Sequence, residues 1–164
     1  MRALDRRRIR RGAVRAFAEA GGSGHPGLCV HGAGRDHTVF TAQADALTGA
    51  GFRVICGDLR GHGASLLDEG TRFSARPALD DIEAILVECQ VDRALLVGHS
   101  LGGNLAQAFT AARPARVTGA VVRAASCNSG PPPWLERMAL RLAAPLLSFV
   151  PPPPPPVVLA RAAA

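Results

Sequence analysis

The sequence contains no lysine, and all 19 of its basic residues are arginines. Alanine, glycine and proline are also abundant, so the exclusive use of arginine indicates a compositional bias. The formal net charge of +6 is therefore weak evidence for a nucleic-acid partner. Seven arginines lie within residues 1–15, but no aromatic residues alternate with them and no nucleic-acid-binding module follows. We therefore expect no nucleic-acid partner and interpret residues 1–12 as a basic N-terminal arm that leads into an edge strand.

Motifs for metals and cofactors are also missing. None of the four cysteines has the C-x-x-C spacing of a zinc or redox site, and we expect them to be reduced and buried. No glycine-rich loop ends in the Lys-Ser or Lys-Thr pair that binds phosphate. The sequence therefore predicts neither a metal nor a cofactor. The cysteines are Cys29, Cys56, Cys89 and Cys127.

Long apolar runs are absent as well. The basic start is not followed by the apolar segment of a secretory signal, and no later stretch is long enough to span a bilayer without a charge or a proline. We expect a cytoplasmic protein without a membrane span.

Short apolar runs and amphipathic stretches alternate along the chain. Continuous apolar runs predict buried strands, and apolar residues at 3.6-residue spacing predict helices between them. Such alternation indicates the α/β class, with an incomplete doubly wound, mainly parallel sheet and helices on both faces. The predicted strands are 28–30, 52–58, 93–98 and 117–125, and the predicted helices are 38–51, 77–90 and 101–112.

The stretch "GHSLGG", residues 98–103, stands between a predicted strand and a predicted helix. A strand that reverses into a helix within so few residues needs small neighbours and leaves Ser100 exposed above the sheet. The backbone N–H of Leu101 then lies at the helix N-terminus, where it can stabilise a developing oxyanion. The "HGAG" stretch after the strand at 28–30 can supply a second donor, from Ala33 or Gly34.

Three stretches, "HGAGRDHTVF", "GDLRGHGAS" and "GHSLGGNLAQAF", resemble the α/β-hydrolase superfamily over about residues 13–150. The resemblance implies that Ser100 is the nucleophile, that the N–H groups of Leu101 and Ala33 form the oxyanion hole, and that Asp58 is a scaffold residue. His31 and His62 are expected to form hydrogen bonds within their own loops. Residues expected to line the site are His31, Gly32, Gly34 and His99.

The same resemblance divides the chain into parts. Residues 13–130 correspond to the N-terminal portion of the hydrolase core, and the helical pattern at 131–150 corresponds to the start of a lid. The proline-rich residues 151–164 are expected to be a disordered tail.

The other members of a catalytic triad are not found after the serine. In this superfamily the acid and the histidine follow the nucleophile, yet after Ser100 the sequence has no histidine, no aspartate and a single carboxylate, Glu136. His99 would diverge from its neighbour at a tight turn, whereas His37, oriented by Asp36, stays open as a substitute base. We therefore interpret the chain as a C-terminally truncated or frameshifted hydrolase.

Two functions remain in competition. The first is a serine hydrolase that acts on a small ester-type or related carbonyl substrate through an acyl-enzyme, inactive or impaired here because the triad acid and histidine are missing. The second is a non-catalytic α/β-hydrolase-like fragment that binds a ligand or a partner. In either case the strand at 117–125 would be an open sheet edge, through which the chain could self-associate.

Overall fold

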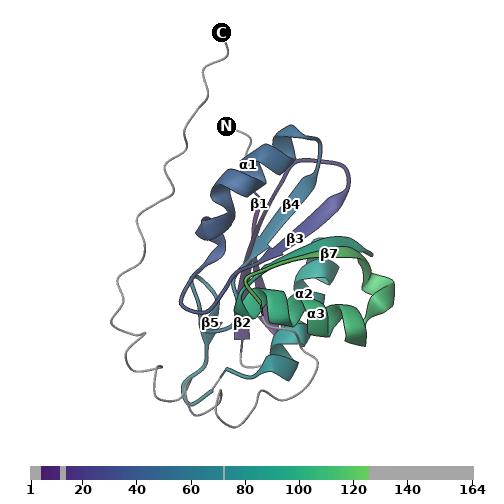
Figure 1. Cartoon of the computed structure of the whole chain (residues 1–164). Coiled ribbons are helices and arrows are strands. Elements are labelled where there is room, and N and C mark those ends of the chain that lie inside the picture. Colours follow the sequence, from purple (N-terminus) through teal and green to yellow (C-terminus); the bar gives the residue numbers. More distant parts are fainter. Residues whose placement is uncertain (1–4, 12–13, 72, 126–164) are drawn as a thin grey trace. The chain divides into compact units, whose positions relative to one another are not determined.

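The computed structural model of the chain describes residues 5–11, 14–71 and 73–125 (Figure 1). The predicted lid helix at 131–150, the tail at 151–164 and Cys127 lie outside the described residues, as does Glu136.

A seven-stranded sheet forms the centre of the described fold, in the order β1-β2-β4-β3-β6-β7, with β5 beside β2. Along the spatial order β4-β3-β6-β7, neighbouring strands pair in parallel. Strand β2 pairs antiparallel with β1, β4 and β5. The predicted incomplete, mainly parallel sheet is thus confirmed. The strands are β1 (Asp5–Arg11), β2 (Val14–Gly21), β3 (Pro26–Val30), β4 (Arg53–Gly57), β5 (Leu66–Leu67), β6 (Ala94–His99) and β7 (Val117–Arg123).

Helices cover both faces of this sheet (Figure 1). On one face, α2 (Ala75–Glu88) and α3 (Leu101–Ala112) pack on the larger apolar core, which includes Leu28, Ile55 and Phe109. On the other face, α1 (Thr41–Gly49) covers a smaller cluster around Cys29 and Cys56. Two short 3₁₀ turns, η1 (His37–Phe40) and η2 (Pro114–Arg116), complete the described elements. None of the described helices is long and apolar enough to cross a membrane.

Most of the segment interpreted as a basic arm belongs to the sheet. Every residue of β1 is in register with β2, from Asp5 opposite Ala20 to Arg11 opposite Val14. Arg6 Nε donates to Glu19 Oε1 at 2.8 Å, and Arg7 Nη1 donates to the carbonyl of Glu88 at the end of α2 at 2.5 Å. The arginines are therefore accommodated on an edge strand, where their charged ends reach solvent or a carboxylate.

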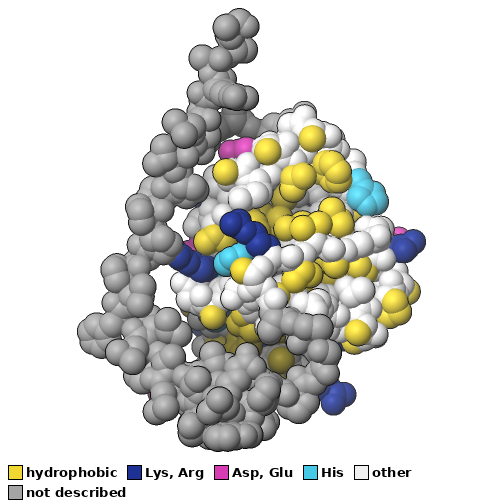
Figure 2. All heavy atoms as spheres, viewed as in Figure 1, with side chains coloured by type: hydrophobic (Ala, Val, Ile, Leu, Met, Phe, Trp, Pro, Cys, Tyr) yellow, Lys and Arg dark blue, Asp and Glu magenta, His cyan; other side chains and the backbone are white. Residues whose placement is uncertain are grey.

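The opposite edge of the described sheet is β7, which pairs with β6 on one side. Val121 is 52% exposed on it, and Figure 2 shows apolar side chains gathered between α1 and β7. Self-association through this edge stays a prediction.

Candidate active site

Ser100 stands alone between β6, which ends at His99, and α3, which begins at Leu101. Its backbone has φ 53° and ψ −120°, a left-handed conformation that costs a residue with a side chain about 1–3 kcal/mol. The conformation is held from both sides, because the N–H of Ser100 donates to the carbonyl of Arg123 at 2.8 Å and its carbonyl accepts from Asn104 at 3.1 Å. Ser100 is half-buried.

The glycines around this serine are required by backbone contacts. A Cβ on Gly98 would lie 2.5 Å from the carbonyl oxygen of Gly102 and 2.6 Å from Cα of Gly103. A Cβ on Gly102 would overlap the carbonyl oxygen of Val30 and lie 2.5 Å from that of His31. The first turn of α3 therefore rests directly on β3 and β6, and this close packing keeps the sharp turn at Ser100 in place.

Substituting alanine for Gly102 tests this packing. Because the clashing atoms belong to the backbone, we expect Gly102→Ala to lower the free energy of unfolding by about 1–3 kcal/mol. Gly49→Ala is the matched control, since a Cβ at Gly49 meets nothing within 4 Å and alanine favours the helix by about 1 kcal/mol or less. Urea denaturation of the two variants gives the comparison, and equal stabilities would mean that Gly102 is not required for packing.

The loop after β3 lies against the serine. A Cβ on Gly32 would be 3.1 Å from Cβ of Ser100 and 3.3 Å from the carbonyl oxygen of His99. The loop turns back on itself, with the N–H of Arg35 donating to the carbonyl of Gly32 at 3.3 Å and Gly34 at φ 67°. Leu101 is the first residue of α3, where an N–H has no acceptor within the helix.

His31 supports this loop from beneath. Its Nε2 accepts from the N–H of Leu59 at 2.9 Å, and its Nδ1 lies 2.8 Å from the carbonyl of Gly32, to which it donates. Burial lowers the pKa of the imidazole, which is 0% exposed, and the ring is neutral with both nitrogens engaged. Contrary to the sequence-based expectation, the side chain does not line an open surface, and it cannot serve as a base.

Asp58, at the carboxyl end of β4, connects two loops. Its Oδ1 accepts from the N–H of His37 at 2.6 Å and lies 2.8 Å from Nδ1 of that ring, and its Oδ2 accepts from the N–H of Ala64 at 2.8 Å. The carboxylate is buried, and these bonds fit the scaffold role that the resemblance implies.

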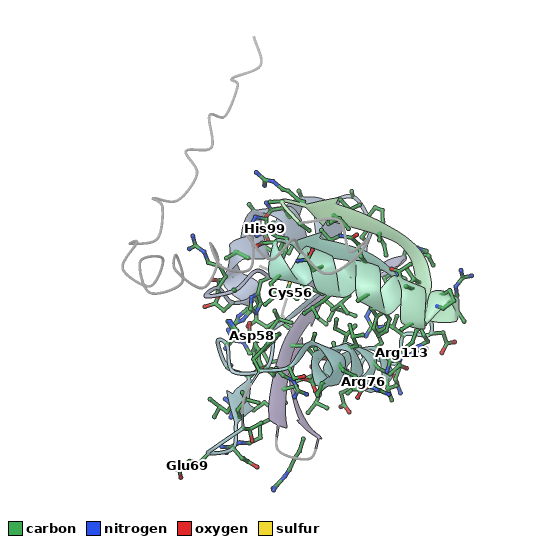
Figure 3. The ribbon with its side chains drawn as sticks, turned by 60° about the horizontal axis from the view of Figure 1, so that its bottom comes forward. Cys56, Asp58, Glu69, Arg76, His99 and Arg113 are labelled. Carbon is green, nitrogen blue, oxygen red and sulfur yellow. The ribbon has the colours of Figure 1, made fainter. Side chains whose placement is uncertain are left out.

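His62 contacts its own loop, as expected, with Nδ1 3.1 Å from the carbonyl of Arg60. Figure 3 shows Asp58 and His99 at one end of the sheet and Arg113 at the far end of α3.

Asp36 does not orient the His37 ring, the possibility that the sequence left open. Asp36 instead caps η1, accepting from the N–H of Thr38 at 2.9 Å and from its hydroxyl at 2.5 Å. The ring of His37 bonds to Asp58 and packs against Phe17 on β2, with 5.0 Å between the ring centroids. In the sheet order, β4 and β3 lie between β2 and the strand that carries Ser100. His37 is therefore directed away from the serine.

One buried ion pair was not expected from the sequence. Asp81 on α2 is only 4% exposed and accepts from Nε and Nη2 of Arg60 at 2.7 and 2.8 Å. Arg60 also donates to the carbonyl of Pro77 at 2.9 Å. The pair fixes the loop after Asp58 to α2, and both side chains are buried.

The alpha/beta hydrolase fold family matches residues 28–149. The chain belongs to the α/β-hydrolase family. It is 36% identical over 99 residues to the AB hydrolase superfamily protein YisY of Bacillus subtilis, covering 60% of this chain and 36% of that protein. Because it spans only about a third of that relative, the activity of the whole protein is a matter for proposal.

Two solved structures are similar to this chain. Est816, described as an N-acyl homoserine lactone degrading enzyme, gives a TM-score of 0.72 at 27% identity, covering 87% of this chain and 54% of that one. A thermophilic esterase from Thermogutta terrifontis gives 0.73 at 28% identity, covering 88% of this chain and 54% of that one.

Proposed function

We propose that Ser100 is the nucleophile of a serine hydrolase that cleaves small ester-type substrates. The observation that carries this proposal is the left-handed backbone of a half-buried serine between β6 and α3. A residue with a side chain holds such a conformation only where its surroundings enforce it, and such strain gathers at functional sites. The names of the solved relatives, a lactone-degrading enzyme and an esterase, favour the same class of substrate.

In the proposed reaction, Oγ of Ser100 bonds to the carbonyl carbon of the ester, and the carbonyl π electrons move onto its oxygen. When the tetrahedral intermediate collapses, the bond to the alcohol oxygen breaks and an acyl-enzyme remains. The serine proton ends on the departing alcohol, and water then releases the acid. A serine here, rather than an aspartate, favours attack on a carbonyl over the opening of an epoxide.

The intermediate needs donors for its oxyanion, and we assign these to the N–H groups of Leu101 and Ala33. Leu101 contributes an N–H without a helical acceptor and the positive end of the α3 dipole. Ala33 follows Gly32, whose backbone lies against Ser100, and is itself exposed. One donor of this kind contributes about 10²–10³-fold to the rate.

A general base for Ser100 is the catalytic group that we cannot assign in this chain. Residues 101–164 contain no histidine and no aspartate, both ring nitrogens of His31 bond to backbone groups, and the His37 ring packs against Phe17 on β2, away from Ser100. A neutral serine hydroxyl is a poor nucleophile. We therefore propose that acylation by these 164 residues is impaired. The same observation favours one alternative, a non-catalytic member of the family that binds a small ligand.

Labelling with a fluorophosphonate tests the assignment of Ser100. In this step Oγ bonds to phosphorus, fluoride leaves, and the serine proton passes to solvent. We expect mass spectrometry to locate the adduct at Ser100. Without a base in the protein, the labelling rate should rise about tenfold per pH unit between pH 7 and 9, as the alkoxide population does.

Ser100→Ala is the control and should remove the adduct. If the folded chain carries no adduct on Ser100 even at pH 9, the binding alternative is correct. If the labelling rate instead levels off near neutral pH, a histidine acts as the base and the proposal of impaired acylation is wrong.

A further inference from the structure

The face of the β1–β2 hairpin that adjoins η1 carries a row of arginines. Residues directly opposite each other on paired strands share a face, and here Arg6 faces Glu19, Arg8 faces Phe17 and Arg10 faces Arg15. Like charges directly opposite destabilise a strand pair. Arg10 and Arg15 do not line the pocket described next, so Arg6 and Arg8 are the members of this row that a ligand there could contact.

Beside this row lies a pocket of about 640 Å³, between the hairpin, η1 and the loop before β5. Small-molecule sites in proteins typically have volumes of about 300–1,000 Å³. Phe17 is 6% exposed and supplies an apolar wall, and the side chains of His37 and Glu19 are 17% and 13% exposed. The residues that line the pocket are Arg6, Arg8, Phe17, Glu19, His37 and Ala64.

Two arginines but only one carboxylate are among the side chains that line this pocket. The carboxylate of Glu19 accepts from Nε of Arg6 at 2.8 Å, and its other oxygen lies 3.7 Å from Nε2 of His37. Asp58 is already bonded to His37 and to the backbone of Ala64. Among the described residues, Arg8 forms no ion pair, and it lines the pocket with its charge uncompensated.

We propose that this pocket binds a small organic anion with at least two negative charges, borne by carboxylates or phosphates. The Arg8 guanidinium pairs with one anionic group, the imidazolium form of His37 donates from Nε2 to the ligand while Nδ1 is held by Asp58, and the Phe17 ring packs against the apolar part. A guanidinium suits either group, because its planar fork matches two oxygens at once.

This site is separate from Ser100. Three strand spacings, about 14 Å in total, separate β2 from β6 in the sheet. The ligand therefore does not occupy the position of the acyl substrate, and the proposal does not rest on the function assigned to Ser100.

Calorimetric titration of the whole chain tests the site, with pyrophosphate and citrate as separate probes at constant ionic strength. We expect saturable binding of at least one probe, and the tighter of the two identifies the preferred group. Arg8→Gln should weaken that binding about tenfold, because one charge-assisted pair is lost. Arg76→Gln is the matched control, since Arg76 is an equally exposed arginine on α2 (Figure 3) and should leave the affinity unchanged.

Nuclear magnetic resonance of the histidine rings gives a second readout. The imidazole signals of His37 should shift on addition of the probe, whereas those of His25, outside the pocket, should not. The absence of saturable binding by both probes would overturn the proposal. So would equal weakening by the two arginine variants, which would indicate a non-specific effect of net charge.

Discussion

Hydrolysis of p-nitrophenyl acetate by this chain at pH 7 is expected to be about 10⁶-fold slower than by a family member with a complete triad. The reason is that, in the part of the chain that the structure describes, His31 is bonded through both ring nitrogens and the His37 ring packs against Phe17, so neither is placed to take the proton of Ser100. The groups of a triad act as a unit, so the loss of one removes most of what all of them contribute. The oxyanion donors proposed at Leu101 and Ala33 should still leave about 10³–10⁴-fold over the reaction in water.

The variant Ser100→Ala distinguishes a chain in which Ser100 has no base from a slow enzyme in which a base still acts on Ser100. Because the serine contributes little without a base, the variant should hydrolyse the ester at nearly the rate of the unaltered chain in the same assay. A fall of about 100-fold or more on removing the hydroxyl would show that a base operates on Ser100, since a hydroxyl without a base contributes far less.

The serine turn is the part of the site that the sequence predicts best. Its requirements are local: Gly98, Gly102 and Gly103 allow close backbone contacts, and those contacts involve strands that are themselves plain apolar runs. The predicted helix at 77–90 is observed at Ala75–Glu88, and the predicted strand at 93–98 at Ala94–His99. These elements are recognisable because periodicity and apolar runs depend on neighbouring residues alone.

Partners distant in the sequence could not be predicted in this way. His37 has Asp36 beside it in the sequence, yet its ring bonds to Asp58, which the fold brings from 21 residues away. The arginines of β1 lack the apolar alternation of a strand, and only their pairing with β2 places them in the sheet. Asp81 looks like a solvent-facing residue until the loop that carries Arg60 packs over it.

Asp81→Asn is expected to lower the free energy of unfolding by about 3–5 kcal/mol. The side chains of Arg60 and Asp81 are each 6% exposed, and two hydrogen bonds join them. The amide keeps the shape of the carboxylate but leaves the guanidinium as a buried charge without its counter-charge. Since domains of this size are stable by about 5–15 kcal/mol, the loss is a large share of the total. Urea denaturation followed by circular dichroism measures it.

Two further variants show whether charge, rather than packing, is responsible. Replacing both partners at once, Arg60→Met with Asp81→Leu, removes the uncompensated charge and should recover most of the lost stability, because apolar groups of similar volume often replace a buried ion pair without loss. Asp92→Asn changes a fully exposed carboxylate 4.0 Å from Arg116 and should leave the stability essentially unchanged. If Asp81→Asn were as mild as Asp92→Asn, the loop after β4 would not depend on this pair. Asp58, which precedes Arg60 in that loop and supports the 31–37 region, would then hold its position through its own hydrogen bonds alone.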